Sequence, residues 1–128
     1  MYVLEGNPEG EAMQIEMDTR GSGTVLVNVQ GRLDAAAAST FKQQITTAIA
    51  EGNVRLALHL AHVSFMDSTG LGALVSTLKA ARKANGDISI IAPSSQVQKL
   101  FRLTAMDRVF KIFDSRDEAL NQLNPSSG

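Results

Sequence analysis

A short segment near the middle of the chain gathers an acid, two hydroxyls and two glycines. It reads Asp-Ser-Thr-Gly-Leu-Gly over residues 67–72, between an apolar stretch and residues at helical spacing. Backbone N–H groups at a helix start have no intrahelical acceptor and attract negative charge. Two interpretations follow. Either Asp67 or Ser68 only caps the helix, while Gly70 and Gly72 allow close packing on a sheet, or Ser68 is an exposed hydroxyl that accepts a phosphate.

Two other chemistries of this segment lack the residues that they need. A phosphorylated Asp67, as in a response-regulator receiver, needs further acids for Mg²⁺, and the corresponding loops offer only Asp34, with Asp18 displaced to a hairpin end. A serine hydrolase needs a base and an acid positioned on Ser68. The segment has no Gly-x-Ser-x-Gly pattern, and both histidines lie earlier in the same strand region. The Gly-rich and lysine patterns of nucleotide-binding loops are also missing from the sequence.

The elements that position this segment follow from hydrophobic periodicity. Alternating apolar residues predict a hairpin, and Asp34 is suited to cap the helix that follows it. Strands then alternate with helices, so the predicted order is β-β-α-β-α-β-α-β-α. This order implies an α/β fold whose mainly parallel sheet has one antiparallel edge strand. The predicted strands cover residues 13–18, 25–29, 55–65, 88–91 and 109–113.

Composition bounds the class of protein. The 128 residues indicate one domain, which we place at 13–123 between an N-terminal extension (1–12) and a flexible tail (124–128). The absence of Cys excludes disulfides and thiolate metal sites, and no metal or cofactor is expected. A net charge of −1 argues against direct binding of nucleic acid or a membrane surface. The N-terminus does not resemble a signal peptide, so we expect a cytoplasmic protein.

The segment at 67–72, with Val-Ser-Phe-Met before it, resembles the signature of STAS domains of the anti-sigma factor antagonist (anti-anti-sigma factor) type. Gly-Arg-Leu-Asp at 31–34 resembles the second landmark of that family. The similarity covers about residues 13–123 in matching element order. The resemblance therefore favours a role for Ser68 beyond capping.

The resemblance implies a protein without catalysis that works by partner switching. An anti-sigma factor that is itself a serine kinase, and carries the ATP, would phosphorylate the serine after the signature Asp, which is Ser68 here. The unphosphorylated protein would bind the kinase, the phosphorylated form would release it, and a serine phosphatase would reset the cycle. By position, the partner surface would include Gly31, Asp34, Asp67, Thr69, Gly70 and Leu71.

One position departs from the family pattern. The central strand carries His59 between two leucines, where such proteins commonly have Asp or Asn. An exposed histidine there would titrate near pH 6.5, whereas the other interpretation is a structural hydrogen-bonding residue. The alternative function is a scaffold: a STAS module that is never phosphorylated, in a sensory complex or a lipid-transport assembly.

Overall fold

The structure is a computed structural model that describes residues 12–123. The predicted extension, apart from Ala12, and the predicted tail therefore lie outside the described residues. Five strands, four helices and one 3₁₀ turn occur in this part of the chain. In chain order they are β1 (Gln14–Thr19), β2 (Thr24–Leu33), α1 (Ala35–Ala50), β3 (Arg55–Met66), α2 (Ser68–Lys83), β4 (Asp87–Ile91), α3 (Ser95–Leu103), η1 (Met106–Arg108), β5 (Lys111–Phe113) and α4 (Arg116–Leu123).

The strands form one sheet in the order β1-β2-β3-β4-β5. β1 pairs antiparallel with β2, and the other pairs are parallel. Each parallel connection passes through a helix, as such crossovers require. The predicted fold class, with one antiparallel edge strand on a mainly parallel sheet, is confirmed.

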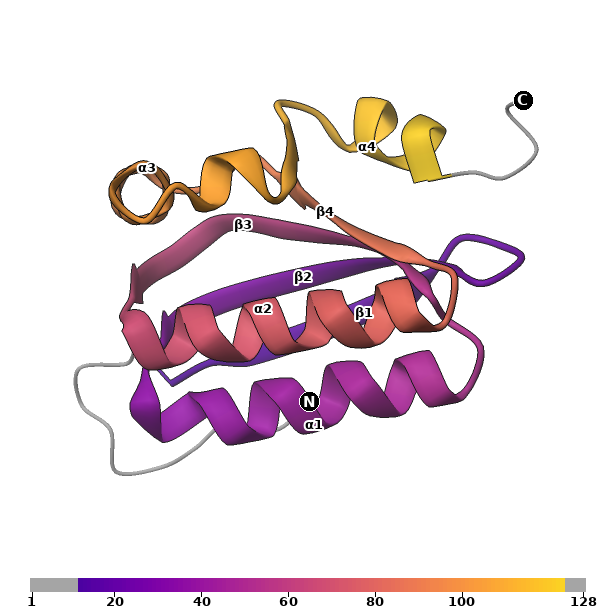
Figure 1. Cartoon of the computed structure of the whole chain (residues 1–128), viewed down its shortest axis with the longest axis horizontal. Coiled ribbons are helices and arrows are strands. Elements are labelled where there is room, and N and C mark those ends of the chain that lie inside the picture. The colour runs from indigo at the N-terminus through magenta and orange to yellow at the C-terminus, as the bar shows by residue number, and fades with distance from the viewer. Residues whose placement is uncertain (1–11, 124–128) are drawn as a thin grey trace.

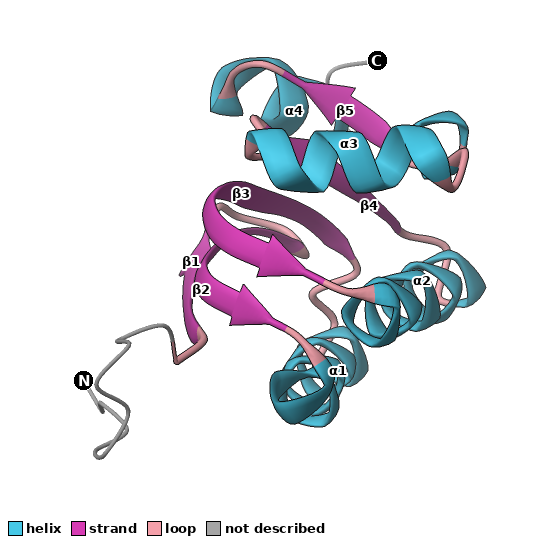
Figure 2. Ribbon diagram, turned by 90° about the vertical axis from the view of Figure 1, so that its left-hand side faces the viewer, coloured by secondary structure: helices cyan, strands magenta, loops and turns pink. Residues whose placement is uncertain are grey.

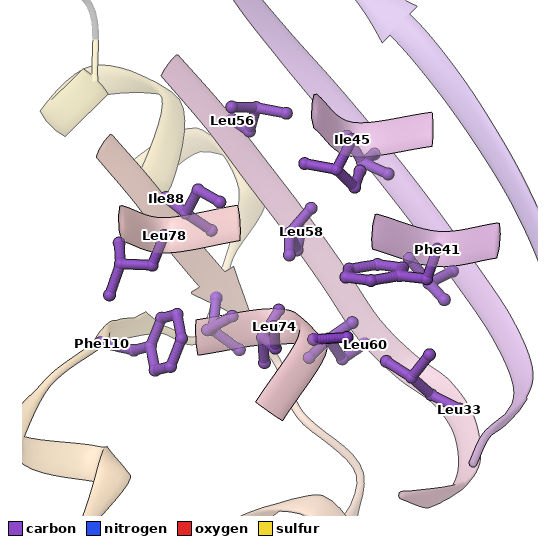
Figure 3. Packing of buried hydrophobic residues seen from close by; sticks show 14 of the residues in the cluster. Leu33, Phe41, Ile45, Leu56, Leu58, Leu60, Leu74, Leu78, Ile88 and Phe110 are labelled. Atoms are coloured by element: carbon purple, nitrogen blue, oxygen red, sulfur yellow. The ribbon is translucent and has the colours of Figure 1, made fainter. Parts of the chain in front are cut away.

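The main core lies between the sheet and the pair α1 and α2, which run side by side along one face (Figure 1). Apolar residues three and four apart on each helix point at the strands, so one stripe of each helix is buried. Figure 3 shows Phe41 and Ile45 of α1 and Leu74 of α2 converging on Leu58 and Leu60 of β3, and all five side chains are fully buried.

A second, smaller cluster lies on the other face of the sheet, under α4. It consists of Leu26, Ala57, Ile91 and Ala119, all buried. Leu26 of β2 points to this face and is covered by α4, whereas the alternating valines of the same strand point into the main core. In the same layer the buried hydroxyl of Ser89 has no hydrogen-bond partner among the described residues. The second face is therefore held by few apolar side chains.

The last strand is shorter than the sequence predicts. Residues 109 and 110 belong to a turn after η1, because both of their N–H groups donate to the carbonyl of Met106. Phe110 turns into the main core and stacks on Phe101, with 5.6 Å between the ring centroids. Within residues 12–123, no helix is both long and apolar enough to cross a membrane.

Candidate functional site

Two helix starts meet at one edge of the sheet. β2 and β3 are parallel neighbours, and their last residues, Leu33 and Met66, lie opposite each other. Figure 2 shows the two strands leading side by side into α1 and α2. Asp34 and Asp67 follow these strand ends directly, so the two segments at 31–34 and 67–72 form one site. The sequence predicts that the second strand ends at residue 29, but β2 continues to Leu33, paired with β3, so residues 31–33 belong to the strand and not to a loop.

Each aspartate is the N-cap of its helix, in nearly the same backbone conformation. Asp34 has φ −114° and ψ −169°, and its Oδ1 accepts from the Ala36 N–H at 3.1 Å. Asp67 has φ −108° and ψ −175°, and its Oδ1 accepts from the Gly70 N–H at 2.8 Å. Of the two residues that the sequence offers as the cap of α2, Asp67 is thus the one that caps it.

The second carboxylate oxygens make different contacts. Oδ2 of Asp34 accepts from Nε of Arg32 at 3.2 Å, and Arg32 lies on β2, the strand that leads into the same helix. Oδ2 of Asp67 accepts from the N–H of Ala35 at 3.2 Å, and Ala35 is the first residue of the other helix. Asp67 therefore binds the starts of both helices and ties them together.

Ser68 is the first residue of α2, and its side chain is exposed. Its hydroxyl makes no hydrogen bond to any other described residue, because Asp67 already provides the cap. The N–H groups of Ser68 and Thr69 have no acceptor within the helix, as is usual for a first turn. An exposed, unbonded hydroxyl at this position is accessible for modification, and Thr69 beside it is also exposed.

The two glycines of the segment have different roles. A Cβ at Gly70 would lie 2.0 Å from the carbonyl oxygen of Leu33, so only glycine fits between α2 and the end of β2. At Gly72 a Cβ would meet nothing within 4 Å. The packing interpretation is thus right for Gly70 and wrong for Gly72. Leu71, which we placed on the partner surface, has its side chain in the core at 7% exposure.

Gly31 and Arg32 shape the rim of the site. Gly31 has φ +94° at an irregularity in the pairing of β2 with β3, a conformation that favours glycine. The Arg32 guanidinium lies 4.5 Å from the ring centroid of Phe65, which is its partner across the two strands. This stacking places a cation next to Asp34. The sequence contains Arg32 in the landmark but gives no sign of this contact.

His59 lies on β3 opposite Asn28 of β2. Its ring is 6.0 Å from that of His62, centroid to centroid. Burial lowers the pKa of His59, and the nearby His62 and Arg116 lower it further. The neutral imidazole is therefore favoured in the folded protein. No group of three or more His, Asp or Glu side chains within residues 12–123 could hold a metal ion.

Comparisons with known proteins identify the family of this chain. The family model of the STAS domain matches residues 14–119. The anti-sigma-B factor antagonist of Bacillus subtilis is 31% identical over 101 residues, which cover 78% of this chain and 92% of that protein.

Two solved structures share the fold. Unphosphorylated SpoIIAA, an anti-sigma factor antagonist, superposes with a TM-score of 0.75 at 24% identity, covering 85% of this chain and 95% of that one. The phosphorylated form of Bacillus SpoIIAA gives a TM-score of 0.70 at 21% identity, covering 87% and 100%. With the family model matched over most of its length and a relative above 30% identity, the chain belongs to the STAS domain family of anti-sigma factor antagonists.

Proposed function

We propose that the protein is an anti-sigma factor antagonist that binds an anti-sigma serine kinase and is switched off by phosphorylation of Ser68. The observation that carries this proposal is the exposed hydroxyl of Ser68, which makes no hydrogen bond to another described residue and lies at the start of α2, beside the capped start of α1. The kinase supplies the ATP and transfers its γ-phosphoryl group to the Ser68 oxygen, releasing ADP and the hydroxyl proton. A serine phosphatase restores the hydroxyl by hydrolysis.

The site can accept a phosphate without losing its fold. The Ser68 side chain makes no hydrogen bond to another described residue, Asp67 provides the cap of α2, and the N–H groups of the first turn favour an anion. The surface changes strongly, however. A phosphate adds about −1.5 to −2 charges next to Asp67 and near Asp34. A partner seated on this surface would meet both the bulk and the like charge, which favours release.

The names of the relatives support the same role. The Bacillus subtilis relative is an anti-sigma-B factor antagonist, and SpoIIAA has been solved in both unphosphorylated and phosphorylated forms. The exposed members of the proposed partner surface are Ser68 and Thr69, with Asp34, Asp67 and Gly31 half-buried beside them. Gly70 and Leu71 contribute from beneath, by fixing the position of α2.

Capture with and without ATP tests the proposal. The wild-type chain and the variants Ser68→Ala and Ser68→Asp serve as baits for a lysate of the source bacterium, and a kinase that is captured is then purified. We expect ATP to release the kinase from wild type but not from Ser68→Ala. We expect Ser68→Asp to bind about tenfold more weakly, since one added charge is worth roughly 1.4 kcal/mol here.

Mass mapping of the chain after incubation with the purified kinase and ATP should place the phosphate on Ser68. Ser39, an exposed serine on α1, provides the matched control, because Ser39→Ala should leave both phosphorylation and release unchanged. Phosphate on another residue would contradict the proposal. Retention of a large complex with ATP present, without phosphate at Ser68, would favour a scaffold instead.

A further inference from the structure

β3 continues beyond its neighbour on one side. β4 pairs with β3 only from Arg55 opposite Asp87 to His59 opposite Ile91, whereas β3 runs on to Met66. Among residues 12–123, no strand lies beside the rest of this edge of β3. Backbone groups at such an edge need other partners, because unpaired N–H and C=O groups are costly once they are covered.

The start of α3 supplies these partners. The Ser94 N–H donates to the carbonyl of Leu60 at 3.3 Å, and the Ser94 hydroxyl donates to the carbonyl of Val63 at 2.7 Å. Two residues further on, the carboxamide of Gln96 makes two bonds to Met66. The Met66 N–H donates to Oε1 of Gln96 at 2.8 Å, and Nε2 of Gln96 donates to the Met66 carbonyl at 2.9 Å.

Gln96 thus supplies the acceptor and the donor that the backbone of a neighbouring strand would otherwise give to Met66. Its carboxamide has the donor and the acceptor of a peptide, and both bind the same residue of β3. Both bonds are partly buried, so water competes with them less than at an open strand edge. Met66 is the last residue of β3 and is followed directly by Asp67, which binds both helix starts.

We propose that Gln96 is a positioning residue of the switch. It fixes Met66, and through Met66 it sets where Asp67 holds the start of α1 and where Ser68 is presented. This inference rests on the proposed function, since it assigns a purpose to that same site. It predicts that loss of one carboxamide on α3 loosens contacts at Ala35 and Gly70, which Gln96 does not touch.

Three variants test the role of Gln96. Gln96→Ala removes both bonds to Met66. Gln96→Glu keeps the acceptor for the Met66 N–H but loses the donor at neutral pH, so its effect should be intermediate. Gln98→Ala is the matched control: Gln98 lies on the same helix and donates to the backbone carbonyl of Pro93 at 2.9 Å, away from Met66.

The first measurement is amide hydrogen exchange by NMR, which needs no partner. In Gln96→Ala, exchange at Ala35 and Gly70 should quicken about fivefold, as expected when roughly 1 kcal/mol of local stability is lost. Exchange in the middle of α1, at Ile45, should not change. In Gln98→Ala, the exchange rates at Ala35 and Gly70 should equal those of the wild type.

The second measurement is the rate of phosphate transfer to Ser68 by the kinase captured above. We expect kcat/KM for Gln96→Ala to fall about tenfold, because a displaced reacting group slows transfer more than it weakens binding. The fall should persist after correction for the folded fraction, and Gln96→Glu should recover part of it. Unchanged exchange at Ala35 and Gly70 in Gln96→Ala would overturn the inference, as would unchanged kcat/KM. Absence of phosphate on Ser68 in wild type would instead overturn the proposed function, and the exchange result would still stand.

Discussion

The β2–α1 and β3–α2 units have the same arrangement of strand, cap and helix, but the first turns of the two helices differ in sequence. Both run from a strand through an aspartate N-cap into a sixteen-residue helix, and they lie in parallel register. In the first turn, however, α1 has three alanines where α2 has Ser68, Thr69 and Gly70. The comparison separates what the fold needs, a capped helix start, from what the proposed switch would use, the exposed Ser68 hydroxyl that bonds to no other described residue.

The two caps also differ in reach. Both carboxylate oxygens of Asp34 bind residues of its own β2–α1 unit, Arg32 and Ala36, whereas Asp67 also binds the N–H of Ala35 on the other unit. The start of α1 therefore depends on a side chain from the β3–α2 unit. We expect the reverse dependence, of α2 on Asp34, to be weaker.

The largest expected effect is at the third helical position, where α1 has Ala37 and α2 has Gly70. Gly70→Ala should lower the free energy of unfolding by about 3 kcal/mol, because its Cβ would meet the Leu33 carbonyl and force a backbone shift. Urea denaturation measures the loss. As a control, Gly72→Ala should raise stability by about 0.5–1 kcal/mol, since the site is open and alanine favours helix. Equal effects of the two substitutions would refute this assignment.

The next effect compares the caps themselves. Asp67→Ala should lower the free energy of unfolding by about 2 kcal/mol, because it removes the cap of α2 and a bond to the start of α1. Asp34→Ala should lower it by about 1 kcal/mol, because it removes the cap of α1. Thermal and urea unfolding of both variants provide the test. Asp67→Asn, which keeps one acceptor oxygen, should fall between wild type and Asp67→Ala. A loss from Asp34→Ala as large as that from Asp67→Ala would show that the link between the helices contributes little.

A smaller effect is the pH dependence of stability that we expect from His59 of β3, which lies opposite Asn28 of β2. The pKa of His59 is lowered in the folded protein, so the unfolded chain takes up a proton more readily. The contribution of neutral His59 to the free energy of unfolding should therefore be fully present above pH 6.5 and decrease as the pH drops below that value. His59→Asn, which makes β3 match β2, should show a shallower fall between pH 7 and 5.5. Identical pH profiles for the two proteins would exclude this histidine as the cause.

The smallest effect is at Ser68. Ser68→Ala should change the free energy of unfolding by less than about 0.5 kcal/mol, because the hydroxyl holds no described residue and Asp67 provides the cap. Calorimetry checks this value. A small change means that any loss of switching in Ser68→Ala comes from the missing phosphate. A loss above 1 kcal/mol would mean that Ser68 has a structural role.

Local patterns in the sequence predict the order of the strands and helices and the cap of α1, but for the cap of α2 they leave a choice between Asp67 and Ser68. Asp34 and Asp67 precede apolar periodicity at helix starts, and one antiparallel strand follows from the hairpin at the start of the domain. The contacts that join distant segments could not be predicted. Asp67 meets Ala35, and Gln96 meets Met66, only because of the strand register and the early end of β4. The roles of Gly70 and Gly72 likewise differ through a single close approach to Leu33.

The small hydrophobic cluster under α4 has a consequence for the cooperativity of unfolding. Few apolar side chains hold α4, and the buried Ser89 hydroxyl beneath it is unsatisfied among the described residues, whereas α1 and α2 share the large core. Local opening should therefore start at α4, at a free-energy cost well below that of global unfolding. Because α4 lies on the face opposite α1 and α2, it can detach while Asp67 still joins the two helix starts (Figure 1). Local opening on the α4 face would therefore leave the joined starts of α1 and α2, where the proposed switch site lies, in place on the other face.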